Sequence, residues 1–171
     1  MTLLDDLLGL RDQLSPPRDV EAHCDIPCGI YDPHYAQVAA LTVVRMFQLM
    51  EAANPPDQSS SKEDVEAYLN SMARYVMVKE EHAQLCKKEV LILWTDYFKP
   101  EHLQQYSNLH DLVWNTTKLC STVKQQVNME AAQQLLGNVQ QIAEIFWATK
   151  GVQTRRISSH QTAGGEFVVP A

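Results

Sequence analysis

Four stretches of apolar residues at helical spacing constrain the fold most, and no segment with the alternation of a β-strand competes with them. The first begins after Pro33, the second ends near Lys99-Pro100, and the third surrounds Leu112. The fourth lies between Asn128, a good helix cap, and Gly151, a good helix stop. Short polar or proline-containing segments separate them. We therefore predict an all-α chain that folds as an antiparallel four-helix bundle.

The predicted bundle occupies the middle of three segments. Residues 1–22 form an acidic leader that ends after Pro16-Pro17, and they lack the positive start and long apolar core of a secretory signal. Residues 23–150 are the predicted globular part, long enough for one core. Residues 151–171 contain Gly164-Gly165 and scattered Ser and Thr, which predicts a flexible tail.

Composition excludes several classes of function. Hydrophobic residues make up 45% of the chain, so it is not a disordered protein. The net charge of −7 makes nucleic acid and anionic membranes poor partners. No apolar run reaches the length of a membrane span. Four cysteines do not suggest a disulfide scaffold, and we expect a reduced, cytoplasmic setting.

The residues that bear most directly on chemistry come after the leader: His23-Cys24-Asp25-Ile26-Pro27-Cys28. If the Ala22–His23 bond were cut, the free amine of His23, the Cys24 amide nitrogen and the Cys24 thiolate would form two adjacent five-membered chelate rings. The Cys28 thiolate can return to the fourth position, with the His23 imidazole above the plane. Planar nitrogen and thiolate ligation suits Ni(II) or Cu(II), whereas zinc prefers a tetrahedron.

Spacing alone leaves other readings open. A Cys-x-x-x-Cys pair is also half of a zinc site, a redox disulfide or two unrelated buried thiols, and by spacing these rank above nickel. No second cysteine pair at ligand spacing occurs later in the chain. Cys86 and Cys120 stand singly in helical stretches, so we expect small core residues there.

Taken together, residues 23–33 closely resemble the nickel hook of the nickel-containing superoxide dismutases. Leu93–Pro100 and Ile145–Lys150 also resemble that family, in the same order, so the resemblance covers residues 23–150. It implies an enzyme that disproportionates superoxide to oxygen and hydrogen peroxide by Ni(II)/Ni(III) cycling. It also implies one nickel ion per subunit.

The resemblance implies the ligands and the maturation as well. The nickel ligands would be the His23 amine and imidazole, the Cys24 amide nitrogen and sulfur, and the Cys28 sulfur. Residues 1–22 would be a propeptide that a dedicated maturation protease removes between Ala22 and His23; a plain N-terminal helix that stays attached is the alternative. The mature chain would assemble as a homohexamer.

Four more residues receive roles around the nickel hook. Tyr31 is the predicted gate, whose phenol holds a water or the substrate; packing against the bundle is compatible with that role. Asp25 is predicted to fix the loop by accepting hydrogen bonds. Tyr97 resembles a second tyrosine of the family's site. Lys99 is predicted to attract the superoxide anion, and a solvated surface lysine is its alternative.

The chain departs from the family pattern at two positions. Ala39 stands where many members carry a glutamate that holds the axial imidazole, and His82 stands where an arginine usually pairs with that glutamate. We predict that His82 hydrogen-bonds His23 directly or through water. An ordinary, partly buried helix histidine is the alternative.

Two other functions compete with the enzyme. One is a nickel- or copper-binding protein that holds the metal without turnover. The other is a helical interaction protein with a redox-active Cys24–Cys28 pair. The match over Trp94–Pro100 favours the enzyme.

Overall fold

The computed structural model describes residues 29–171. The chain divides into two compact units, Met1–Ile30 and Tyr31–Ala171. His23, Cys24, Asp25 and Cys28 lie outside the described residues, nearly all of which belong to the second unit.

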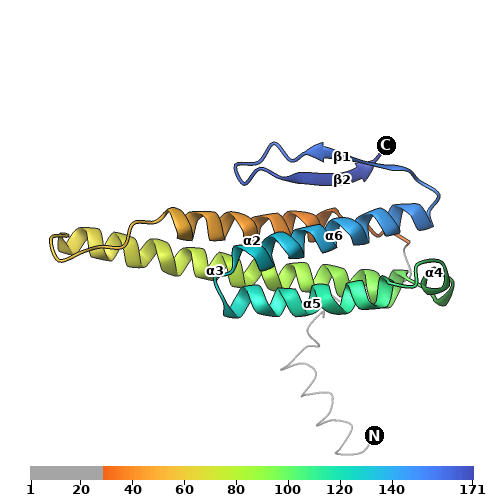
Figure 1. Ribbon diagram of the computed structural model, residues 1–171, viewed down its shortest axis with the longest axis horizontal. Helices are drawn as coiled ribbons and strands as arrows, with labels where there is room; N and C mark the ends of the chain where they lie inside the picture. Colours follow the sequence, from red (N-terminus) through yellow and green to blue (C-terminus); the bar gives the residue numbers. More distant parts are fainter. Residues whose placement is uncertain (1–28) are drawn as a thin grey trace, which may run out of the picture. The chain divides into compact units, whose positions relative to one another are not determined.

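Four long helices dominate this second unit, and each runs opposite to the one before it (Figure 1). α2 packs against α3 and α6, and α5 packs against the same two helices. The chain was predicted to be all-α: it is mostly helical, as expected, but it also contains a small two-stranded sheet. The elements are α2 (His34–Ala52), α3 (Lys62–Ile92), the π-helix η1 (Leu93–Tyr97), α4 (Pro100–Gln105), α5 (Leu109–Gln125), α6 (Met129–Thr149), β1 (Thr154–Ser158) and β2 (Glu166–Pro170).

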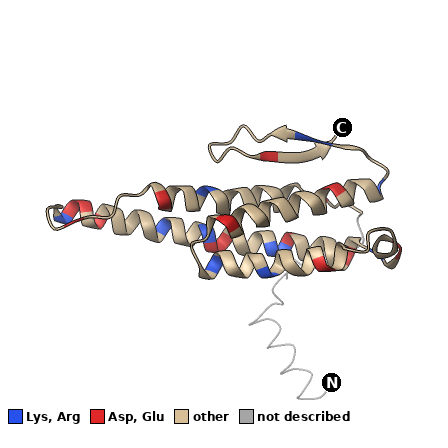
Figure 2. Cartoon of the chain, viewed as in Figure 1, with Lys and Arg blue, Asp and Glu red and all other residues tan. Residues whose placement is uncertain are grey.

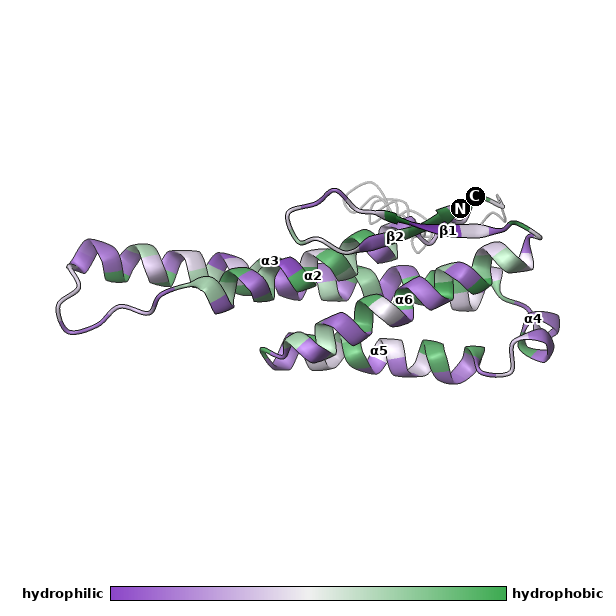
Figure 3. Cartoon of the chain, turned by 45° about the horizontal axis from the view of Figure 1, so that its top comes forward, coloured by the Kyte–Doolittle hydropathy of each residue, from purple (hydrophilic) through white to green (hydrophobic). Residues whose placement is uncertain are grey.

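The core lies between the four long helices. Hydrophobic and hydrophilic residues alternate along each long helix (Figure 3), and all four long helices contribute to one cluster of buried apolar residues. The largest fully buried side chains on the helices include Phe47, Leu109, Leu135, Ile142 and Phe146. Among residues 29–171, no helix has both the length and the apolarity that a membrane span requires.

Side-chain caps fix where several helices begin. Asp32 Oδ1 accepts the N–H of His34, the first residue of α2, at 2.7 Å, since the cap residue Pro33 has no side-chain acceptor of its own. Asn128 Oδ1 accepts the Ala131 N–H at 3.0 Å, as predicted for the fourth helix. Ser61 and Asp64 cap the second long helix reciprocally. These bonds satisfy N–H groups that a helix start leaves without partners.

The second long helix does not continue as a regular α-helix to Phe98. Its end is the π-turn η1, in which the Phe98 N–H donates to the Leu93 carbonyl at 2.9 Å, five residues back. π-turns insert one extra residue into a helix and therefore change the direction of the later side chains. The predicted end near Lys99-Pro100 is confirmed, but the geometry of the last turn is not that of an α-helix.

The prediction of a flexible tail over residues 151–171 is wrong. β1 and β2 pair antiparallel, with Arg156 opposite Val168, and Gly164 and Gly165 have the positive φ angles that the connecting turn requires. Figure 3 shows β2 as a hydrophobic strand, and its Phe167 and Val168 are buried. The strand β2 was not predicted because its apolar run is short and follows a polar, glycine-rich turn. It packs on α2 and α6.

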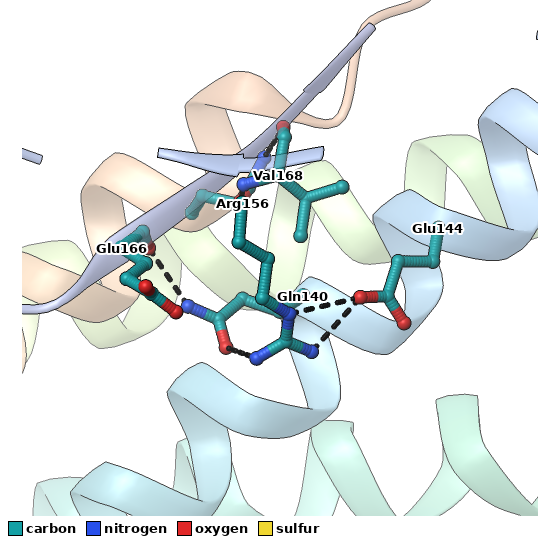
Figure 4. Close-up of polar contacts among 6 residues, drawn as sticks. Gln140, Glu144, Arg156, Glu166 and Val168 are labelled. Atoms are coloured by element: carbon teal, nitrogen blue, oxygen red, sulfur yellow. Dashed lines mark hydrogen bonds and ion pairs between the residues drawn. The ribbon is translucent and has the colours of Figure 1, made fainter. Parts of the chain in front are cut away.

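Polar side chains of α2 and α6 attach this hairpin. Gln37 is completely buried: its Nε2 donates to the Val168 carbonyl at 3.0 Å, and its Oε1 accepts the Val168 N–H at 2.7 Å. On α6, Gln140 Nε2 donates to the Glu166 carbonyl at 2.7 Å. Arg156 of β1 donates to Gln140 Oε1 and pairs with Glu144 at 2.9 Å (Figure 4). The hairpin is thus held to both helices.

We predict that Gln37→Leu lowers the free energy of unfolding by about 2–4 kcal/mol, because it leaves the buried N–H and C=O of Val168 without partners. Gln48→Leu is the matched control, since Gln48 donates to the half-buried Ala163 carbonyl and otherwise accepts only a long bond from the Arg45 side chain, at 3.3 Å. Urea denaturation followed by circular dichroism measures both. Equal losses in the two variants would contradict the attachment through Gln37.

Candidate functional site

Two tyrosines that the sequence assigned to the site lie together. Tyr31 lies just before the start of α2, and Tyr97 is the last residue of η1. Their ring centroids are 5.6 Å apart, with planes inclined at 54°. Both side chains are half-buried. The pair therefore joins the last part of the predicted nickel hook to the end of the second long helix.

Tyr97 stands in an aromatic cluster. Its ring centroid lies 4.5 Å from that of Phe146 and 5.3 Å from that of Phe98, and the His102 ring stacks on it at 5.7 Å. The Tyr97 hydroxyl lies 2.7 Å from Thr149 Oγ1 at the end of α6. Packing and one hydrogen bond therefore fix both the ring and the hydroxyl.

A cation accompanies this cluster. Lys150 Nζ lies 5.2 Å from the Tyr97 ring centroid and 4.9 Å from that of Phe146. An ammonium at this distance from a ring face is attracted to it. Lys150 also comes directly after the last residue of α6, where the helix dipole favours a positive charge.

Sequence reasoning missed the roles of Phe146, Thr149 and Lys150. The signal was present, because the stretch Ile145–Lys150 carries part of the family resemblance. No residue type in it indicated chemistry, however. Only the packing of α6 against η1 brings these side chains to Tyr97.

Lys99 is the residue directly before α4. Its side chain is exposed, and its N–H donates to His102 Nδ1 at 3.2 Å. Its main chain therefore helps to place His102 beside Tyr97. The predicted attraction of an anion by its ammonium stays a prediction.

Ala39 and His82 can be placed on their helices. Ala39 is fully buried on α2. His82 is half-buried on α3, and its Nδ1 lies 3.0 Å from the Val78 carbonyl one turn earlier. Because a carbonyl can only accept, Nδ1 carries the proton in this bond and Nε2 is the nitrogen left to face another group. The hydrogen bond from His82 to His23 stays a prediction, since His23 lies outside the described residues.

The predicted metal ligands and Asp25 also lie outside the described residues. Within residues 29–171, no group of three or more His, Cys, Asp or Glu side chains is arranged to hold a metal ion.

Cys86 and Cys120 are fully buried, so the prediction of small core residues is confirmed. They contact each other between α3 and α5. The contact with Cys120, together with burial, raises the pKa of the Cys86 thiol well above its ordinary value. A neutral, enclosed thiol is a poor nucleophile.

We predict that iodoacetamide alkylates Cys86 in the folded protein at least about a hundredfold more slowly than in urea, because the thiol must first be exposed by local opening. Peptide mass spectrometry after timed alkylation gives the rate at each cysteine. Alkylation of Cys86 at the rate of an unfolded thiol would contradict the burial.

Comparisons with a family profile, with curated proteins and with solved structures all lead to the same family. Residues 18–150 match the sequence profile described as nickel-containing superoxide dismutase. The curated superoxide dismutase [Ni] of Streptomyces coelicolor (strain ATCC BAA-471 / A3(2) / M145) is 37% identical over 136 residues, which span 80% of this chain and 94% of that protein. The superoxide dismutase [Ni] of Streptomyces seoulensis is 38% identical over the same length, with the same coverage of both proteins.

Solved structures agree. The native structure of nickel superoxide dismutase superposes with a TM-score of 0.64 at 37% identity, covering 75% of this chain and 99% of that one. A nickel-containing superoxide dismutase with nickel ligation of the oxidised state gives a TM-score of 0.65 at 36% identity, with the same coverage. β1 and β2 lie beyond the end of the profile match at residue 150.

Proposed function

Because this chain belongs to the nickel-containing superoxide dismutase family, we propose that His23, Cys24 and Cys28 hold its nickel ion and that Tyr31 and Tyr97 stand beside it. The family makes the chain an oxidoreductase that uses nickel and disproportionates superoxide to oxygen and hydrogen peroxide. The observation that carries the site is the Tyr31–Tyr97 pair, whose first member stands three residues after Cys28 in a chain matched to the family over residues 18–150.

The donor set fits nickel. Two thiolates, an amine and a deprotonated amide would provide the nitrogen and sulfur donors that suit Ni(II), and the His23 imidazole would be a further nitrogen donor; sulfur donors favour access to the higher oxidation state. When bound, nickel supplies the one-electron exchange with superoxide. The residues around it have the other tasks, which are to admit the anion, deliver protons and keep the site ordered.

The fold is consistent with a nickel hook that leads into the first helix of a bundle. We propose that α2, α3, α5 and α6 form an antiparallel four-helix bundle, which their alternating directions and mutual contacts support. The nickel hook precedes α2, and η1 and the end of α6 bring Tyr97 to Tyr31. Asp25 is the proposed internal brace of the loop, and Tyr31 is the proposed gate.

Maturation completes the proposed ligand set. An amine at His23 exists only after cleavage between Ala22 and His23, so a maturation protease is part of the proposal. A homohexamer is proposed from the family resemblance, and a cytoplasmic location from a cysteine content that does not suggest a disulfide scaffold.

We predict that protein beginning at His23 binds about one nickel per chain, whereas the chain that retains residues 1–22 binds nickel weakly and lacks dismutase activity, because its His23 nitrogen is an amide. Metal analysis after gel filtration and a superoxide decay assay measure the two properties. Full activity with the leader attached would refute the proposed ligand set.

Cysteine variants provide the matched control. Cys28→Ser should abolish both nickel retention and activity, because a hydroxyl is a poor ligand for this site. Cys120→Ser should retain the activity per bound nickel, with a loss of stability from a polar group in the core. Equal loss of activity per nickel in the two variants would also count against the assignment.

Lys150 supports a proposal for substrate entry. The chain carries a net charge of −7, and acidic side chains occur on all the long helices (Figure 2). Such a chain repels an anion unless positive charge stands near the entrance. We propose that Lys150, held over the Tyr97 ring, attracts superoxide together with Lys99.

We predict that Lys150→Met lowers kcat/KM for superoxide by about 2- to 10-fold at low ionic strength and weakens its dependence on salt, because a steering charge is lost. Lys118→Met is the matched control, since Lys118 Nζ also lies over an aromatic ring, that of Trp114, at 4.4 Å on α5. Stopped-flow decay of superoxide at several salt concentrations measures both. An unchanged salt dependence in Lys150→Met would contradict the steering role.

A further inference from the structure

The Thr149 hydroxyl takes part in two hydrogen bonds. Its Oγ1 donates to the Phe146 carbonyl at 2.7 Å and lies 2.7 Å from the Tyr97 hydroxyl. A threonine hydroxyl has one proton, and a carbonyl can only accept. The Thr149 proton therefore belongs to the bond with Phe146, and Tyr97 must be the donor in its bond to Thr149.

The end of α6 explains why Thr149 bonds to this carbonyl. The Lys150 N–H, which would bond to Phe146 in a continuing α-helix, bonds instead to the carbonyls of Trp147 and Ala148. The carbonyls of a last helical turn need partners from outside the helical ladder. The Thr149 side chain supplies one to Phe146, which fixes the direction of the second bond.

The surroundings of Tyr97 hold the phenol in this orientation. Its ring is packed against Phe146 and stacked on His102, so the hydroxyl stays directed toward Thr149. The titratable and charged groups that face it are Tyr31, His102 and Lys150. With its proton committed to Thr149, the phenol oxygen offers lone pairs to any further partner.

We propose that Thr149 is a positioning residue that makes Tyr97 a hydrogen-bond acceptor in the site. Tyr97 then orders a donor, such as a water molecule, beside Tyr31, and it does not give its own proton to the reaction. Reduction of superoxide to hydrogen peroxide consumes two protons, and both reach the site from groups other than Tyr97. This inference rests on the proposed function, in which Tyr31 and Tyr97 stand beside the nickel.

The first test needs no variant of Thr149 and no nickel. The ultraviolet resonance Raman spectrum of the chain beginning at His23, minus that of its Tyr97→Phe variant, isolates the Tyr97 phenol. The tyrosine doublet in this difference distinguishes a phenol that donates from one that only accepts. A donor signature is expected, and an acceptor signature would overturn the proposal.

The second test compares Thr149→Val with Thr149→Ser in the nickel-loaded protein. Valine has the shape of threonine without the hydroxyl, so the Tyr97 proton is released to the site. We expect unchanged nickel content, an altered Raman signature of Tyr97 and a fall in kcat of about 10-fold or more, with a smaller effect on KM. Serine restores the hydroxyl, and it should restore both the Raman signature and kcat.

The outcomes separate this inference from the proposed function. A wild-type chain that neither binds nickel nor consumes superoxide would refute the proposed function. The Raman test would still report whether Tyr97 donates its proton to Thr149. Wild-type kcat in Thr149→Val with an altered Raman signature would overturn the positioning role. A failure of Thr149→Ser to restore kcat would assign the loss to packing.

Discussion

The contact between Phe146 and Tyr97 is the interaction on which the arrangement of the site depends. Phe146 is fully buried on α6, and its ring centroid lies 4.5 Å from that of Tyr97. Aromatic pairs of this kind add to the free energy of burial and restrict the orientation of both rings. Through this contact, the end of η1 meets the end of α6. Thr149 and Lys150 then reach Tyr97 without any further adjustment of the chain.

The hairpin supports the same region from the other side of α2. Phe167 of β2 packs edge-on against the ring of His34, the first residue of α2, with the ring centroids 5.1 Å apart. Gln37, one turn later, bonds to the main chain of Val168. Because α2 begins shortly after Tyr31, contacts that immobilise its first two turns also limit the movement of Tyr31. The hairpin lies beyond the residues that match the family profile, so this support is an addition to the shared fold.

The sequence predicted the long helices well, because their buried positions recur at helical spacing and residues such as Asn128 cap them. It did not predict η1, since a π-turn has no characteristic pattern of apolar residues. It predicted a flexible tail where β1 and β2 form, because Phe167-Val168-Val169 is too short an apolar run to stand out among polar residues. The contacts of Thr149 and Lys150 with Tyr97 were missed for another reason: they come from the packing of α6 against η1, which no local pattern encodes.

The π-turn makes the length of the segment Leu93–Tyr97 a constraint in addition to its residue types. Each residue of an α-helix turns the chain by about 100°, so removing one residue from η1 would rotate the remainder of the turn by that angle relative to α3. Tyr97 would then leave the rings of Tyr31 and Phe146, even if every remaining side chain were unchanged. Related sequences should therefore lack insertions and deletions within η1, whereas the exposed connection between α2 and α3 is free to change in length.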